Sequence, residues 1–406
     1  MVTKNAGKLA LAVLIAIPAV LLSATHTHLP PEWSLLVFGS AILASAFLLT
    51  WAAECAQKDI SGGLAIAILA LIAVLPEYAV DLYFAFSAGT NPTHGPYAVA
   101  NMTGSNRLLL GLGWPLVIGL LVWKARSRKI PSLRDSISLP RETRIPLLVL
   151  GAASVYAFLI PSLGRISILD TAVLFSIFGF YLWHLSKEQH SNPEFMGVAG
   201  FIASFSRQRR IASVVALFSF AALAILASAE PFAESLIATG KAFGINEFLL
   251  VQWLAPLASE SPEFLVAIML ALRGNQEASF GTLLSSKINQ WTLLLGSIPL
   301  AHLLGGGESA LVMDFRQTQE VFLTAAQSLL GLAIVINLKV SLGEALLLFV
   351  LFFIQFFIPG PESRTIVSGV YLVFAGFIGI RSWKETRDLY RDVLIREKIG
   401  QIALPR

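Results

Sequence analysis

The chain has 406 residues, of which 56% are hydrophobic and only 13% are charged. This composition excludes a water-soluble globular protein and predicts an all-α membrane protein. The single cysteine, Cys55, excludes an intramolecular disulfide framework and a cluster of thiolate metal ligands. The net charge of +4 does not indicate nucleic-acid binding, because the basic residues flank apolar segments and form no continuous stripe.

About 12 apolar segments are long enough to span a bilayer as helices. They cover residues 7–24, 33–53, 61–88, 96–122, 145–161, 166–186, 211–240, 245–273, 277–303, 318–338, 341–358 and 364–382. A cleaved signal peptide is the alternative interpretation of the first segment, because Lys4 and Lys8 precede it. Most Lys and Arg residues fall on one side if both termini are cytoplasmic, and this pattern predicts a bacterial inner-membrane protein with that topology.

Two of the apolar segments carry a proline–glutamate pair, Pro76-Glu77 and Pro262-Glu263. A carboxylate at membrane depth costs about 3 kcal/mol, so its occurrence in two related segments favours an ion site. Each proline lacks an N–H group, which predicts a helix break and free carbonyls near Ile72 and Ala258.

The two segments run in opposite directions in the predicted topology, which indicates two inverted five-helix repeats. The repeats are predicted at 33–186 and 211–358, with a cytoplasmic linker at 187–210. Residues 1–32 add a helix and an outer loop, and residues 359–406 add a helix and a basic cytoplasmic tail.

The motifs resemble those of the cation/calcium exchanger superfamily, which includes the sodium/calcium exchangers. That family has a segment like A-x-G-T-S-x-P-E in each repeat, and here residues 70–77 read ALIAVLPE and residues 256–263 read PLASESPE. A second family segment, G-N-x-x-G-S-N, is similar to VANMTGSN at 99–106 and FGTLLSSK at 280–287. The resemblance implies that Glu77 and Glu263 are the central metal ligands and that Ser105 and Ser286 are hydroxyl ligands.

The first repeat departs from the family pattern. Ala73 and Val74 replace a Thr-Ser pair, and Leu109 replaces an asparagine. In the second repeat Ser259 keeps a hydroxyl, whereas Gln290 takes the place of Asp or Asn. Na⁺ and Ca²⁺ need about six oxygen ligands. The losses therefore argue against a full complement of sodium sites.

Additional charges accompany the paired glutamates. Asp81 and Glu260 lie at helical spacing from them and are expected to share their helix faces. Arg107 and Lys287 occupy almost equivalent places after the two serines. A base that pairs with a site acid would fill one cation position, whereas unpaired crowded acids would keep a proton. Either case favours proton coupling or fewer ions; the alternative is a structural ion pair that locks the bundle.

Other polar residues are weaker candidates. Glu54, Glu230 and Glu234 lie nearer the ends of their segments and are expected at the interface, with a pathway role as the alternative. His26 and His28 are too few to predict a metal site and favour a solvated loop.

The predicted function is a secondary active cation antiporter that exports Ca²⁺ in exchange for H⁺ or Na⁺. The alternatives are an Na⁺/H⁺ or other monovalent-cation antiporter with the same fold, and a membrane sensor or scaffold that no longer transports. An enzyme is not predicted, because neither H-E-x-x-H nor G-x-S-x-G occurs. The expected partners are the bilayer and inorganic cations, with no cofactor; the oligomeric state is open.

Overall fold

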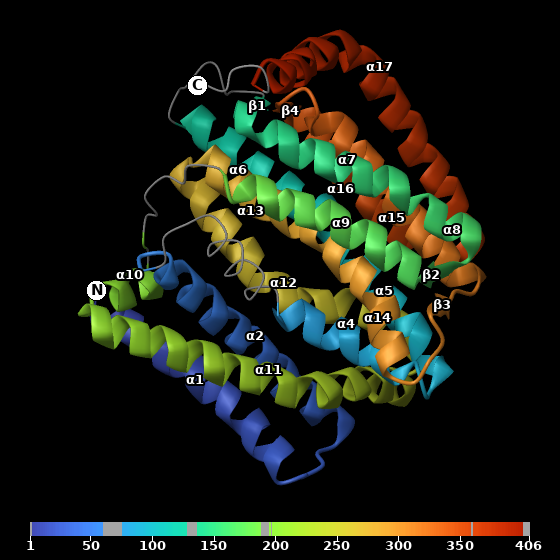
Figure 1. The fold of residues 1–406 in the computed structure, drawn as a ribbon. Coiled ribbons are helices and arrows are strands. Elements are labelled where there is room, and N and C mark those ends of the chain that lie inside the picture. The colour runs from blue at the N-terminus through green and yellow to red at the C-terminus, as the bar shows by residue number, and fades with distance from the viewer. Residues whose placement is uncertain are drawn as a thin grey trace. The chain divides into compact units, whose positions relative to one another are not determined.

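The computed structural model describes residues 2–59, 75–127, 136–187, 195, 197–358 and 360–400. This part of the chain is almost entirely helical, as the sequence predicts (Figure 1). Within it, nine helices are long and apolar enough to span a membrane, and α16 (Leu342–Phe357) is a shorter apolar helix. These helices and the hydrophobic composition of the chain define an integral membrane protein.

The described helices form two compact units, each of which contains segments from both predicted repeats. The first unit comprises Met1–Ser105, Gly164–Leu265 and Thr292–Gln317. The second unit comprises Asn106–Leu163, Val266–Trp291 and Thr318–Arg406. Helices α5 (Gly95–Leu108), α12 (Glu247–Arg273) and α15 (Phe315–Val335) continue from one unit into the other.

The first unit has a core of small and branched side chains where α1 (Val2–Ala24), α2 (Pro31–Ala56), α10 (Gly197–Ala203) and α11 (Arg207–Phe243) meet. Its other elements are α4 (Leu75–Ser87), the 3₁₀ turn η1 (Pro92–His94), β2 (Arg165–Ser167), α9 (Ile168–Leu185), α14 (Leu295–Leu304) and β3 (Ala310–Val312). Helix α11 lies along α2, and α1 packs against both (Figure 1). Gly39 of α2 faces the Phe232 ring of α11 so closely that a Cβ atom would touch it. Small residues therefore let these two helices approach closely.

The second unit is built around the π-helical turn η2 (Leu109–Gly113). Its other elements are α6 (Trp114–Ser127), β1 (Ser136–Ser138), the 3₁₀ turn η4 (Arg141–Thr143), α7 (Arg144–Ala157), α8 (Leu159–Leu163), α13 (Gln276–Asn289), β4 (Lys339–Ser341), α16 and α17 (Pro361–Gly400). Helix α16 packs on α6 and η2, and α13 packs on α6 and α7. Gly111 of η2 has no room for a side chain because Phe352 of α16 lies against it.

The expected spans correspond to helices wherever the structure describes them. The segment predicted at 61–88 is described only from Leu75, so the expected free carbonyl near Ile72 lies outside the described residues. The segment predicted at 277–303 consists of α13, the π-helical turn η5 (Gln290–Leu294) and α14. Helix α17 extends well beyond the predicted end at residue 382.

Two short antiparallel ribbons join the repeats, and the sequence did not predict them. Strand β1 pairs with β4 in the second unit, and β2 pairs with β3 in the first. In each ribbon, a strand that precedes the fourth helix of one repeat pairs with a strand that precedes the fifth helix of the other. This reciprocal pairing is what an inverted repeat produces. Capping boxes begin the helices after β2 and β4, with Ser167 and Asp170 in one and Ser341 and Glu344 in the other.

Candidate ion-binding site

The two central glutamates are both buried in the first unit. Glu77 lies in the first turn of α4 and is 1% exposed, and Glu263 lies in α12 and is 9% exposed. Their carboxyl groups are close enough to interact electrostatically. Among the described residues, Oε2 of Glu263 has no hydrogen-bond partner. Two interacting buried carboxyl groups need a proton or a cation to compensate their charge.

Asp81 adds a third buried carboxyl group, one turn after Glu77 on α4. Asn101 of α5 lies against this carboxylate, although no hydrogen bond of ordinary geometry forms between the described side chains. Both oxygens of Asp81 are inaccessible to solvent. Sequence reasoning did not select Asn101 as a site residue, although it falls on the first asparagine of the family segment G-N-x-x-G-S-N, four residues before Ser105. An amide next to a carboxylate offers a neutral oxygen for a hard cation.

Helices α5 and α12 approach closely beside Ser105. A Cβ atom on Gly104 would overlap the backbone carbonyl of Gln252, so only glycine fits at this position. The Gln252 side chain donates a hydrogen bond from Nε2 to Oγ1 of Thr103, at 3.3 Å. Ser105 is fully buried, and its hydroxyl has no partner among the residues described. The glycine of the second family segment thus brings the predicted hydroxyl ligand next to α12.

The expected helix break near Ala258 is not present as a break. Helix α12 continues through Pro256 and Pro262, and the proline at 262 only withholds the N–H group that Ala258 would otherwise accept. Ser259 donates its hydroxyl hydrogen to the carbonyl of Ala255 within the same helix, at 3.2 Å. Glu260 is completely buried one residue further along. The helix therefore continues although each of its two prolines removes one backbone hydrogen bond.

The remaining predicted site residues belong to the second unit. Ser286 and Lys287 lie on α13, Gln290 begins η5, and Arg107 lies near the end of α5. All four are buried. The six predicted residues in the first unit are Glu77, Asp81, Ser105, Ser259, Glu260 and Glu263.

Arg107 forms a buried ion network with two residues that sequence reasoning missed. Its guanidinium lies 2.6 Å from Oε2 of Glu320 on α15, and the other Glu320 oxygen lies 3.2 Å from Nε of Arg364 on α17. Gln355 of α16 accepts a hydrogen bond from Arg107 at 2.8 Å. This network agrees with the alternative of an ion pair that locks the bundle. Glu320 belongs to no motif, and Arg364 is the first residue of the segment predicted at 364–382; its side chain is only 9% exposed.

Lys287 contacts a residue of the opposite repeat. Its Nζ donates a hydrogen bond to Oδ1 of Asn106, at 2.7 Å. The same nitrogen lies 4.5 Å from the centre of the Trp291 ring. Both Lys287 and Asn106 are completely buried. An amide oxygen and an aromatic face together stabilise a buried ammonium group.

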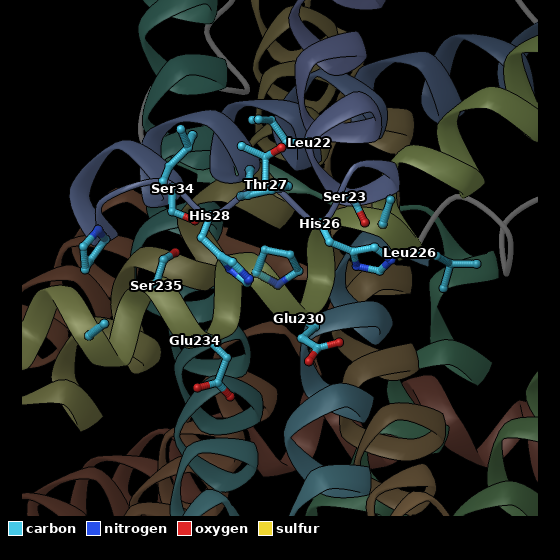
Figure 2. Close-up of a pocket in the computed structure, with 16 residues that line it drawn as sticks. Leu22, Ser23, His26, Thr27, His28, Ser34, Leu226, Glu230, Glu234 and Ser235 are labelled. Atoms are coloured by element: carbon cyan, nitrogen blue, oxygen red, sulfur yellow. The ribbon is translucent and has the colours of Figure 1, made fainter.

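A separate pocket of about 440 Å³ opens in the first unit (Figure 2). His26 and His28 reach it from the connection between α1 and α2, and Glu230 and Glu234 reach it from α11 (Figure 2). Glu234 is 46% exposed and accepts a hydrogen bond from Tyr83 of α4 at 2.7 Å. In the described part of the chain, no three or more His, Cys, Asp or Glu residues are arranged to hold a metal ion. These four polar side chains share the lining of the pocket with apolar residues such as Phe38 and Leu226.

Comparison with known proteins identifies the family to which the chain belongs. Residues 32–187 and 213–359 match the family described as sodium/calcium exchanger protein, so the chain belongs to that family. The crystal structure of an H⁺/Ca²⁺ exchanger, CAX, is 41% identical, covers 97% of this chain and 98% of its own, and has a TM-score of 0.89. Family membership assigns the chain to membrane transport and not to catalysis.

More distant structures share the fold. Native YfkE is 15% identical, with a TM-score of 0.61 over 89% of this chain and 99% of its own. The sodium-calcium exchanger NCX_Mj is 18% identical, with a TM-score of 0.51 over 86% of this chain and 100% of its own. No curated protein matches the sequence significantly.

Proposed function

We propose that this protein is a secondary active antiporter that moves Ca²⁺ across the membrane in exchange for protons. The observation that carries the proposal is the interaction of Glu77 with Glu263, two buried carboxyl groups at equivalent places in inverted repeats. Calcium prefers carboxylate and neutral oxygen ligands, which are the groups that α4, α5 and α12 supply in the first unit.

The roles follow from the chemistry of each side chain. Glu77 and Glu263 are the central ligands, because a carboxylate contributes both charge and coordination. In the first unit the neutral oxygens come from Ser105 and Ser259, and the charge is adjusted by Asp81 and Glu260.

Exchange, and not uniport, follows from the cost of buried charge. A carrier with two uncompensated carboxylates is costly to reorient, so the exit of one cation requires the entry of another or of protons. Protons are favoured over sodium for two reasons. Ala73 and Val74 lack the hydroxyls of the Thr-Ser pair in sodium-coupled relatives. In addition, CAX, with 41% identity over 97% of the chain, is described as an H⁺/Ca²⁺ exchanger.

The same proposal includes the setting of the protein. Both termini are placed in the cytoplasm of a bacterium, with the chain in its inner membrane, because most Lys and Arg residues then lie inside. The partners are the lipid bilayer and the transported cations, and no cofactor takes part.

Isotopic calcium uptake into proteoliposomes tests the proposal. Purified protein is reconstituted, and uptake is driven in parallel by an outward proton gradient and an outward sodium gradient. We expect uptake under the proton gradient, and loss of uptake in Glu77→Gln and Glu263→Gln. Glu32→Gln, an exposed glutamate at the start of α2, is the matched control and retains wild-type uptake.

The outcomes separate the possible functions. Calcium uptake under the sodium gradient alone would show that the counter-ion is Na⁺ and not H⁺, and Ca²⁺ would remain the substrate. Proton flux driven by sodium without calcium movement would identify a monovalent-cation antiporter. Folded protein with no flux of any of these ions would refute transport, and normal flux in Glu263→Gln would refute the site.

A further inference from the structure

Asn106 and Lys287 occupy the same position in the two repeats. Each directly follows the predicted serine ligand, Ser105 in one repeat and Ser286 in the other. The π-helical turns give an independent alignment, because η2 begins at Leu109 and η5 begins at Gln290, four residues after each serine. Structural and sequence registers therefore agree on the equivalence.

Equivalent residues of inverted repeats can touch only near the pseudo-two-fold axis that relates the repeats. Lys287 and Asn106 do touch, through the 2.7 Å hydrogen bond from Nζ to Oδ1. The sequence is asymmetric at this symmetric place: one repeat supplies an amide oxygen, and the other supplies an ammonium group. Both side chains are 0% exposed, so the ammonium group is enclosed by protein.

An enclosed amide oxygen is a ligand for a monovalent cation such as Na⁺. In this chain the ammonium group of Lys287 takes that oxygen, and the Trp291 ring provides a second favourable contact for a positive charge at 4.5 Å. Arg107, the base of the other repeat, lies 2.6 Å from Glu320 and not at the Asn106 amide.

We propose that Lys287 is a built-in monovalent cation that occupies the Asn106 amide oxygen and lowers by one the number of counter-cations carried in each transport cycle. This inference rests on the proposed antiport function and makes Lys287 a determinant of ion specificity. This role requires no change in the fold, because the positive charge comes from the Lys287 side chain, which packs within the second unit.

Two variants make the local charge more negative by one unit while acting oppositely on the contact. Lys287→Gln removes the ammonium group and weakens the contact with Asn106. Asn106→Asp keeps the ammonium group and strengthens the contact by adding a carboxylate 2.7 Å from it. A charge role predicts the same change in ion binding from both variants, whereas a purely structural role predicts opposite changes in stability and no change in ion binding.

The first measurement is the unfolding temperature of purified protein in NaCl and in choline chloride at equal ionic strength. Wild type is expected to show no sodium-specific increase. Lys287→Gln and Asn106→Asp are each expected to gain one, because a cation that binds only the folded state raises its stability. Two control variants are not expected to gain sodium dependence. Lys287→Arg keeps the positive charge, and Lys339→Gln removes a lysine on β4 whose side chain is 63% exposed.

The second measurement is the calcium gradient at which net flux in proteoliposomes is zero. Suppose that a variant carries one additional counter-cation for each Ca²⁺. The calcium gradient that balances a tenfold gradient of that cation is then about tenfold larger than in the wild type. We expect this change in Lys287→Gln and in Asn106→Asp, with Lys339→Gln as the control.

The results distinguish the two proposals. Absence of a sodium-specific gain in both folded variants, or an equal gain in Lys339→Gln, overturns the role of Lys287. If Lys287→Gln does not fold, Asn106→Asp alone decides, because it keeps the Lys287 ammonium group and its contact with the Trp291 ring. Sodium binding gained by the variants of a protein that carries no calcium would support the role of Lys287 and refute the calcium proposal.

Discussion

The buried ion network of Glu320 provides the sharpest test of packing in the second unit. Glu320→Gln keeps the shape of the side chain but removes the charge that compensates Arg107 at 2.6 Å and Arg364 at 3.2 Å. Their side chains are 0%, 2% and 9% exposed in the order Arg107, Glu320 and Arg364, so water cannot replace the carboxylate. Removal of one partner from a buried pair costs about 3–5 kcal/mol. We expect a loss of stability at the upper end of this range, since both guanidinium groups lose the carboxylate that they share.

Removal of the whole network is expected to cost much less. In the triple variant Arg107→Met, Glu320→Leu, Arg364→Met, none of the three charges of the network remains, and apolar replacement of such triads ranges from neutral to about 4 kcal/mol stabilising. The assay is thermal and denaturant unfolding of purified protein in one detergent. Arg364→Met alone is expected to fall between the extremes, because the shorter Arg107–Glu320 pair stays intact. Wild-type stability in Glu320→Gln, or a triple variant less stable than Glu320→Gln, would refute this reasoning.

Three further predictions concern local features. Gly104→Ala should destabilise the protein by about 1–3 kcal/mol, because its Cβ would overlap a backbone carbonyl, whereas Gly119→Ala, with open space around it, should be neutral or slightly stabilising; unfolding temperatures of the pair decide this. Ser341→Ala should cost about 0.5–2 kcal/mol through loss of the capping box before α16, and an unchanged unfolding temperature would contradict it. The hydrogen bond from Arg210 lowers the pKa of Asp59 below its usual value, so its stabilising effect is present at neutral pH and is lost as the pH falls through that lowered pKa. Asp59→Asn should reduce the acid dependence of the unfolding temperature, and an identical pH profile in the variant would exclude this contribution.

The sequence by itself determined the class of protein and the depth of its central acids. Long apolar segments must form helices in a bilayer, because every backbone polar group has to be satisfied within the segment. The recurrence of proline–glutamate pairs then indicated the inverted repeats and located Glu77 and Glu263, which the structure finds buried and interacting. These inferences use periodicity and composition, which are local properties of the chain.

Only the tertiary structure decided which polar groups meet. Arg107 pairs with Glu320, more than 200 residues away, although four other acids were the expected candidates. Asn106 meets Lys287, and Gly104 meets the backbone of Gln252, because helix packing brings these distant positions together. The three-residue strands were equally unpredictable, since they are too short to show an alternating pattern. Partner choice among buried charges depends on which helix faces pack together, and no local pattern in the chain encodes that choice.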